Sequence, residues 1–282
     1  MQFTQEQIKG KIKSLAKQKN ADARILMRVY MMERFLERIS VSDYKENFII
    51  KGGMLVTAMV GVSLRSTMDI DTTIKNLNLS EAAARQMIGE ICQIDIQDGV
   101  SFEIKGTSRI MDETEYPGIR FNMDAVMGGM VTPMKIDIST GDVITPRAVE
   151  YRYKLLLEDR SICLWSYNLE TILAEKLQTI LSRGILNTRM RDYYDISVLL
   201  SIYDKAIDST VLKKAFSATC KKRGSENLKY DCRKIVADIA DDERMRSLWK
   251  SYQKKYLYAQ SISYEDIINS AELLLNKIDD KE

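Results

Sequence analysis

Two aspartates, Asp69 and Asp71, are separated by one isoleucine in the segment STMDIDTTI. The segment alternates and is rich in threonine and isoleucine, which predicts a β-strand. On a strand both carboxylates would point to one face and Ile70 into the core. Crowding raises the pKa of one carboxylate unless a cation lies between the two, and Mg²⁺ prefers such oxygen ligands together with substrate phosphates. The pair is therefore either the start of a metal site or two solvated aspartates on an exposed face.

A later acidic residue, Asp137, has the same kind of setting in the segment KIDIS. Apolar residues flank it in a pattern that again predicts a strand. A lone carboxylate in a buried strand would be costly. It makes sense beside Asp69 and Asp71 on a neighbouring strand, as the third carboxylate of a metal site.

A glycine pair, Gly52–Gly53, follows Lys51 and a short apolar run. Glycine lets the backbone bend freely and lets another group approach closely. The apolar residues that follow predict a helix opening directly after the pair. Glycines at that point can direct backbone N–H groups at a phosphate, although a simple tight turn would use the same residues.

The amino-acid composition excludes several kinds of active site. The chain of 282 residues contains no histidine, which excludes a Ser-His-Asp or Cys-His site and any histidine-ligated metal. Its four cysteines are scattered without CxxC spacing, so neither a zinc site nor a disulfide framework is indicated. No apolar run approaches the roughly 20 residues of a membrane span, and the N-terminus is too polar for a signal peptide. We therefore expect a cytoplasmic protein without a membrane partner.

Charge is unevenly distributed although its net value is only +2. Residues 39–150 hold 10 basic and 16 acidic residues, whereas residues 213–255 hold 13 and 6. A basic half beside an acidic half suits a polyanion held against a metal site, although solvated helix faces would give the same pattern. The basic residues that could bind an RNA backbone are Lys213, Lys214, Lys221, Lys222, Arg223, Lys229, Arg233 and Lys234.

The elements needed to position these residues can be outlined from periodicity. Helical spacing fills residues 4–38 with a break near Asp22, and a further helix follows with Ser80 as its cap. Strands are predicted at 101–110, 116–123 and 134–140, which gives an α/β (α+β) fold with a mixed sheet and flanking helices. After Pro146 the pattern becomes helical, with helices at 168–183, 192–204, 209–218, 233–240, 243–256 and 264–278. We expect a first domain at 1–150 and a helical second domain at 151–282.

The order of glycine pair, helix, DxD strand and later lone-Asp strand resembles the nucleotidyltransferase fold of the DNA polymerase β superfamily. Five motifs sharpen the likeness over about residues 20–205, and they follow in order as KGG from Lys51, RSTMDID from Arg65, KIDISTGD from Lys135, EKL from Glu175 and RDYYD from Arg191. In this set the sequence resembles the AbiEii family, the nucleotidyltransferase toxins of abortive-infection toxin–antitoxin systems.

The resemblance implies an activity and its partners. These toxins are metal-dependent nucleotidyltransferases, so it implies an NTP substrate and Mg²⁺ or Mn²⁺. Several members modify the 3′ end of tRNA and stop translation, which implies tRNA as acceptor and a role in phage defence. It also implies a cognate antitoxin.

The resemblance further implies roles for individual residues. The catalytic residues would be Asp69, Asp71, Asp137, Lys176 and Asp192, with the first three binding metal. The nucleotide-binding residues would be Lys51, Gly52, Gly53, Arg65, Thr67, Lys176 and Asp195. Taken alone, Lys176 would be an ordinary solvated helix lysine, and the cluster Arg191–Asp195 could equally be an i,i+4 salt bridge.

Two other functions stay open. The same carboxylates could serve an enzyme that modifies a protein or a small molecule, of the antibiotic-adenylating kind. A degenerate fold kept as a non-catalytic nucleotide-binding module is the third interpretation. The intact acidic set argues against the last, because paired carboxylates without a cation repel one another.

Overall fold

The computed structural model describes residues 3–76, 80–110 and 118–279, which form two compact units. The first unit comprises Met1–Asp142 and Val149–Ser166, and the second comprises Val143–Ala148 and Tyr167–Glu282. The mixed α/β fold expected from the sequence is confirmed. The domain division at residue 150 stays a prediction.

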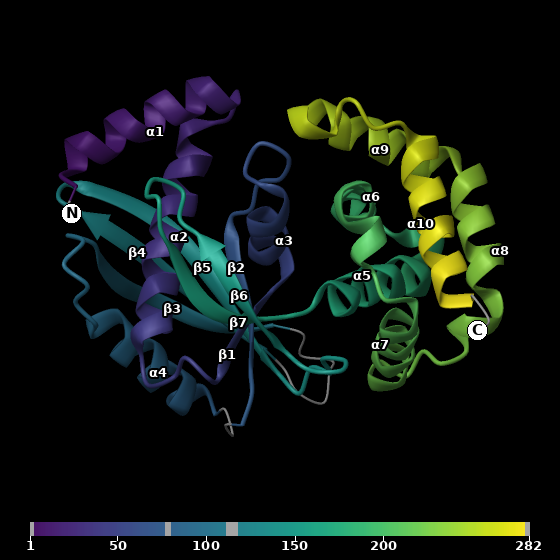
Figure 1. Ribbon diagram of the computed structural model, residues 1–282, viewed down its shortest axis with the longest axis horizontal. Coiled ribbons are helices and arrows are strands. Elements are labelled where there is room, and N and C mark those ends of the chain that lie inside the picture. The colour runs from purple at the N-terminus through teal and green to yellow at the C-terminus, as the bar shows by residue number, and fades with distance from the viewer. Residues whose placement is uncertain (1–2, 77–79, 111–117, 280–282) are drawn as a thin grey trace. The chain divides into compact units, whose positions relative to one another are not determined.

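The first unit is built on one mixed sheet with strand order β3-β4-β5-β2-β1-β7-β6 (Figure 1). β2 and β5 are parallel, as are β1 and β7, and the other neighbours are antiparallel. The strands are β1 (Phe48–Lys51), β2 (Asp69–Ile74), β3 (Ser101–Ile110), β4 (Gly118–Met127), β5 (Met130–Thr140), β6 (Val149–Lys154) and β7 (Ser161–Ser166).

Three strands, β1, β6 and β7, were not predicted by the sequence analysis. Their segments are short, and the buried Ile162 and Leu164 of β7 alternate with more exposed residues. That alternation is the signal that could have revealed the strand. Of the strand expected at 116–123, residues 116 and 117 lie outside the described residues.

Four helices belong to the first unit: α1 (Gln5–Lys19), α2 (Ala23–Val41), α3 (Gly52–Val60) and α4 (Glu81–Gln93). Asp22 and Ser80 cap α2 and α4 as expected, each accepting a bond from a backbone N–H of the first helical turn. α2 packs against β5 and β7 and contacts α4, and it lies along the sheet in Figure 1. The buried Phe35 and Leu36 of α2 and the buried Ile136 of β5 belong to the core of this unit.

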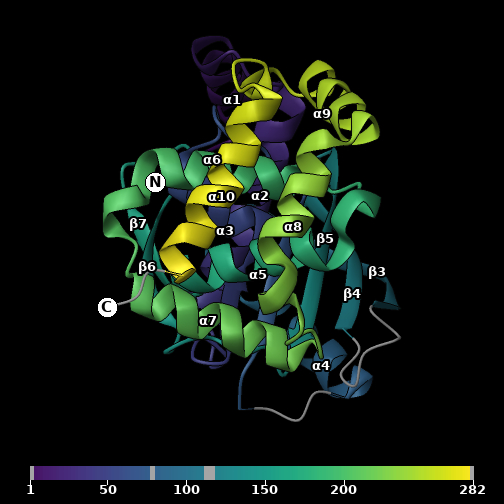
Figure 2. The same ribbon diagram turned by 90° about the vertical axis from the view of Figure 1, so that its right-hand side faces the viewer.

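The second unit is helical. α5 packs against α6 and α7, while α10 packs against α6, α7 and α8; α8 and α10 run side by side in both views (Figures 1 and 2). Its helices are α5 (Leu169–Arg183), α6 (Met190–Tyr203), α7 (Ser209–Lys222), α8 (Leu228–Asp241), α9 (Glu243–Lys255) and α10 (Tyr264–Asp279), with 3₁₀ turns η1 (Gly184–Leu186), η2 (Asp204–Ala206) and η3 (Leu257–Ala259). Asn168 caps α5 as expected, because its side chain accepts the Thr171 N–H at 2.8 Å.

Across the described parts of the chain, none of the helices combines the length and the apolar run that a membrane crossing would take.

Candidate active site

A row of four charged side chains crosses the middle of the sheet. In the strand register Lys51 of β1 is opposite Asp71 of β2, Asp71 is opposite Asp137 of β5, and Asp137 is opposite Arg120 of β4. Residues opposite one another on neighbouring strands share a face. Asp69 shares that face, being two residues from Asp71, and the fully buried Ile70 points to the other. The sheet therefore gathers the three predicted carboxylates, with a cationic residue at each end of the row.

The carboxyl group of Asp71 is the most constrained of the three. Burial raises its pKa above the ordinary value, and the nearby Asp137 and Asp69 act in the same direction. The Gly53 N–H, which donates to Asp71 Oδ2 at 3.0 Å, and the charge of Lys51 oppose the rise. This is the situation in which a bound cation would stabilise the charged form.

The glycine pair allows the strand and the helix to approach this closely. A Cβ on Gly52 would lie 2.2 Å from Asp71 Oδ2, and Gly52 has a φ of +59°. A Cβ on Gly53 would lie 2.7 Å from Thr67 Oγ1 and 2.9 Å from a terminal nitrogen of Arg65. The expected nucleotide-binding residues of the first unit are thus brought together. The Gly53 N–H, which the sequence suggested for a phosphate, is directed here at a carboxylate.

Lys51 and Thr67 have further partners on the chain. Lys51 Nζ donates to Ser139 Oγ at 2.7 Å and pairs with the Asp142 carboxylate. Ser139 also donates to Asp142, at 2.6 Å. Thr67 is buried, and its hydroxyl donates to the Asp69 carbonyl oxygen at 3.3 Å. Ser139 and Asp142 stand in the motif that begins at Lys135, but the sequence alone assigned them no role.

Asp137 is held by a residue that the sequence analysis did not single out. Arg120 Nε and Nη2 donate to the two oxygens of Asp137 at 2.7 and 2.6 Å, a bidentate pair between neighbouring strands. The sequence shows an arginine in the predicted strand YPGIRFNM. It does not show that this strand pairs with the strand of Asp137 in the register that brings the two side chains together.

A divalent cation fits part of this arrangement. Asp69 and Asp71 offer hard oxygen ligands on one face, and the raised pKa of Asp71 marks a carboxyl group that lacks compensating charge. Asp137 has both oxygens engaged by Arg120. Within residues 3–76, 80–110 and 118–279, no group of three or more acidic or cysteine side chains is arranged to hold a metal ion. The donor set therefore fits a cation at the pair and not at all three carboxylates as they stand.

A second cluster lies in the helical unit, between α5 and α6. Lys176 Nζ donates to Asp195 Oδ2 at 2.7 Å and to Asp192 Oδ1 at 3.2 Å. Only 11% of the Lys176 side chain is exposed, and Asp192 and Asp195 are buried. Arg189, which the sequence did not single out, pairs with Asp192 at 2.8 Å. Lys176 is therefore not an ordinary solvated helix lysine.

The eight basic residues proposed for RNA lie on α7 and α8 and the turn between them, and all are exposed. Some of them contact the chain itself: Arg223 donates to Gln178 at 2.5 Å, and Arg233 pairs with Asp279 at 2.8 Å. Tyr230, 77% exposed, lies under Lys229, whose Nζ is 4.8 Å from the ring centroid.

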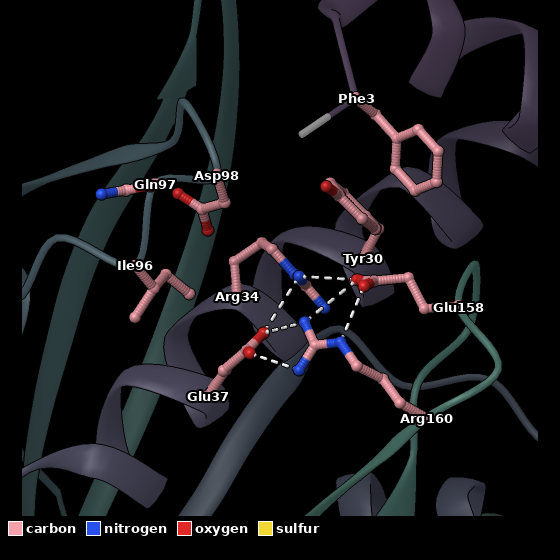
Figure 3. A pocket seen from close by; sticks show the side chains of 9 residues that line it. All are labelled: Phe3, Tyr30, Arg34, Glu37, Ile96, Gln97, Asp98, Glu158 and Arg160. Carbon is pink, nitrogen blue, oxygen red and sulfur yellow. Dashed lines mark hydrogen bonds and ion pairs between the residues drawn. The ribbon is translucent and has the colours of Figure 1, made fainter. Parts of the chain in front are cut away.

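A hollow of about 250 Å³ in the first unit contains none of the predicted site residues (Figure 3). Its charged side chains are paired: Arg34 pairs with Glu37 and Glu158 at 3.0 and 2.9 Å, Arg160 pairs with the same two acids, and Asp98 pairs with Arg38 at 2.8 Å. Because these charges are satisfied within the chain, we assign the hollow no chemistry.

Comparisons with known proteins agree with the motif order. The model of a family described as nucleotidyl transferase AbiEii toxin, type IV TA system, matches residues 34–270. No curated protein sequence matches the chain. Among solved structures, a Helicobacter pylori protein described as a candidate nucleotidyltransferase is similar at 16% identity, with a TM-score of 0.49, covering 91% of this chain and 97% of that one. JHP933 from Helicobacter pylori is similar at 16% identity, with a TM-score of 0.46, covering 88% and 90%.

Proposed function

The chain belongs to the AbiEii family of nucleotidyl transferase toxins of type IV toxin–antitoxin systems, and from this premise we propose that it transfers a nucleoside monophosphate from an NTP to the 3′ end of tRNA. The reaction depends on a divalent metal, Mg²⁺ or Mn²⁺. The acceptor hydroxyl oxygen forms a bond to the α-phosphorus, the bond to the β-phosphate oxygen breaks, and pyrophosphate leaves. The modified tRNA no longer supports translation, which makes the protein a toxin in phage defence.

One observation carries the proposal: Asp69 and Asp71 share a face of β2, and Asp71 meets the N-terminus of α3 at the Gly53 N–H. A strand that carries a carboxylate pair beside a glycine-opened helix offers metal ligands and phosphate donors in one place. A side chain on Gly52 would clash with Asp71, and one on Gly53 would clash with Thr67 and Arg65, so only glycines allow this close approach.

Each remaining residue has a role in this proposal. Asp69 and Asp71 hold the cation, which when bound offsets the charge of the triphosphate and of the leaving pyrophosphate. Arg65 and Thr67 lie beside Gly53 and orient the phosphates. Asp137 assists as the third carboxylate only after release from Arg120, so its loss costs less activity than the loss of Asp69.

From the family resemblance we also propose roles for residues of the second unit. Lys176 serves as a point charge for the triphosphate, and its two carboxylate partners, Asp192 and Asp195, hold the ammonium group in position. The exposed basic residues of α7 and α8 bind the tRNA backbone, which makes the affinity fall as salt rises. A cognate antitoxin neutralises the protein in the cytoplasm.

The test is nucleotide transfer by the purified chain. Each labelled NTP is incubated with total tRNA or with total cellular protein, with Mg²⁺, Mn²⁺ or chelator, and the variant Asp69→Ala is run beside the wild type. We expect label at tRNA 3′ ends, lost with chelator and reduced about 100-fold or more in Asp69→Ala, because cation and phosphate stabilisation are lost together. Label in protein alone would overturn the tRNA acceptor. Equal toxicity of wild type and Asp69→Ala in a bacterial host would overturn the proposal that the toxicity depends on this enzymatic site.

A further inference from the structure

Five aromatic rings form a continuous cluster in the helical unit. This aromatic cluster comprises Tyr194 of α6, Trp249 and Tyr252 of α9, Tyr256, and Tyr258 of η3. The Trp249 and Tyr252 rings stack with centroids 5.4 Å apart, and Tyr256 and Tyr258 stack at 5.3 Å. Tyr252 joins the two stacks, at 4.7 Å from Tyr256.

The cluster has a buried base and a partly exposed edge. Trp249 and Tyr194 are each 1% exposed, and the Trp249 ring N–H donates to the Ile262 carbonyl oxygen at 3.1 Å. Tyr252, Tyr256 and Tyr258 are only half-buried. The buried rings fix the position of the exposed ones, so the edge is a preformed surface of aromatic faces and phenol groups.

Cations surround that edge. Lys255 Nζ lies 5.3 Å from the Tyr256 ring centroid, and the Arg191 guanidinium lies 5.9 Å from it while donating to the Tyr256 hydroxyl at 3.3 Å. Lys250 and Lys254 of the same helix are exposed. α9 as a whole carries five basic residues and one acidic residue. Aromatic faces with interleaved cations are the surface on which single-stranded nucleic acids stack their bases.

We infer that the aromatic cluster and its cations bind unpaired bases of RNA, which deepens the proposed function by naming how the single-stranded end of the acceptor is held. The inference rests on that function for the identity of the RNA. Arg191 and Tyr194 belong to the same helix as Asp192 and Asp195, so one element carries both the stacking surface and the acidic partners of Lys176. The positive charge of α9 disfavours a second copy of the same surface, and the partly exposed tyrosine rings favour unpaired bases over an acidic-faced protein.

The experiment measures binding of a fluorescent eight-nucleotide single-stranded RNA by anisotropy, without NTP and with chelator. The variants are Tyr256→Ala, Tyr258→Ala and Tyr256→Phe, with Tyr44→Ala as the matched control because Tyr44 is also half-buried but belongs to the first unit and bonds to the acidic Glu90. Loss of one stacked base predicts about 5- to 100-fold weaker binding for each alanine variant. Tyr256→Phe, which keeps the ring, and the control should bind within about threefold of wild type. A blunt RNA duplex should show no difference among the variants.

Unchanged affinity in both alanine variants, or an equal loss in Tyr44→Ala, would overturn the inference. Thermal melting identifies an alanine variant that fails to fold, and the other alanine variant then decides. A loss of affinity for duplex RNA as large as the loss for single-stranded RNA contradicts stacking. Loss of a dimer in sedimentation, with RNA affinity intact, would assign the surface to a second copy instead.

Transfer of nucleotides is assayed separately from RNA binding. A wild type that transfers nucleotides while the alanine variants bind RNA normally defeats this inference alone, whereas a wild type that binds RNA but never transfers defeats the proposed function alone.

Discussion

At the scale of single residues, Asp71 shows how tightly the candidate site is built. Its carboxylate is buried, accepts the Gly53 N–H, and leaves no space for a side chain on Gly52. Gly52 also has a positive φ, which other residues adopt only at a cost. Two separate demands, one steric and one conformational, therefore fall on the same glycine.

The substitution Gly52→Ala should separate those demands. Gly224 is the matched control because its φ is also +59°, yet a Cβ there would meet nothing within 4 Å. Gly224→Ala should lower the unfolding free energy by about 1–2 kcal/mol through backbone strain alone. Gly52→Ala should cost clearly more, because the new methyl group must displace Asp71. Denaturant unfolding measures both, and equal losses would show that Asp71 moves aside freely.

At the scale of elements, the register of the strands brings together charged residues that lie far apart in the sequence. β1, β2, β5 and β4 bring Lys51, Asp71, Asp137 and Arg120 into one row, with two acids at its centre and a cation at each end. The two central acids repel each other, and Asp137 raises the pKa of Asp71. The Arg120 pair at one end therefore stabilises two strands and also limits that repulsion.

A double-mutant cycle on Arg120→Gln and Asp137→Asn tests this view. Arg120→Gln leaves the mostly buried Asp137 carboxylate beside Asp71, so it should lower the unfolding free energy by about 1–3 kcal/mol. The double variant should lose less than the sum of the singles, with a coupling of about 0.5–3 kcal/mol. Arg233→Gln breaks the exposed Arg233–Asp279 pair and should cost under about 1 kcal/mol. Strict additivity at Arg120 and Asp137 would contradict a coupled pair.

Features that depend on neighbouring residues could be predicted from the sequence, whereas features that depend on distant segments could not. The strand around Asp69 and Asp71, the helix after Gly53 and the cap at Asn168 were predictable because each depends on residues within a few positions. The direction and register of strands depend on distant segments. The Arg120–Asp137 pair, 17 residues apart in the chain, could therefore not be seen before the structure.

The aromatic cluster was missed for a related reason. Tyr252, Tyr256 and Tyr258 lie close in sequence, but their meaning depends on Tyr194 and on the burial of Trp249, which come from the packing of α9 against α6. The sequence analysis placed its RNA contacts on α7 and α8 by charge alone. Charged residues can be counted in a sequence, whereas the stacking of aromatic rings from two helices depends on how the chain folds.

At the scale of the whole molecule, the path of the chain links the two compact units three times. It passes from the first unit to the second after Asp142, returns after Ala148, and passes again after Ser166. The exchanged segment Val143–Ala148 is tied to the start of α5: Asn168 Nδ2 donates to the Thr145 carbonyl oxygen at 2.6 Å, and the Thr145 N–H donates to Thr171 Oγ1 at 3.2 Å. A fragment that begins at Tyr167 would lack this segment and the bonds it makes.

The contribution of that tie can be measured with Thr171→Val, which keeps the shape of the fully buried side chain but removes the acceptor for the Thr145 N–H. An unpaired buried donor should lower the unfolding free energy of the second unit by about 1–3 kcal/mol. The matched control is Thr57→Val, because the buried Thr57 hydroxyl bonds only to a carbonyl oxygen of its own helix, Gly53 O at 2.8 Å. It should cost under about 1 kcal/mol in denaturant unfolding. If Thr171→Val were as mild as the control, the exchanged segment would owe its place to the chain path alone, and the helical unit would be expected to fold without it.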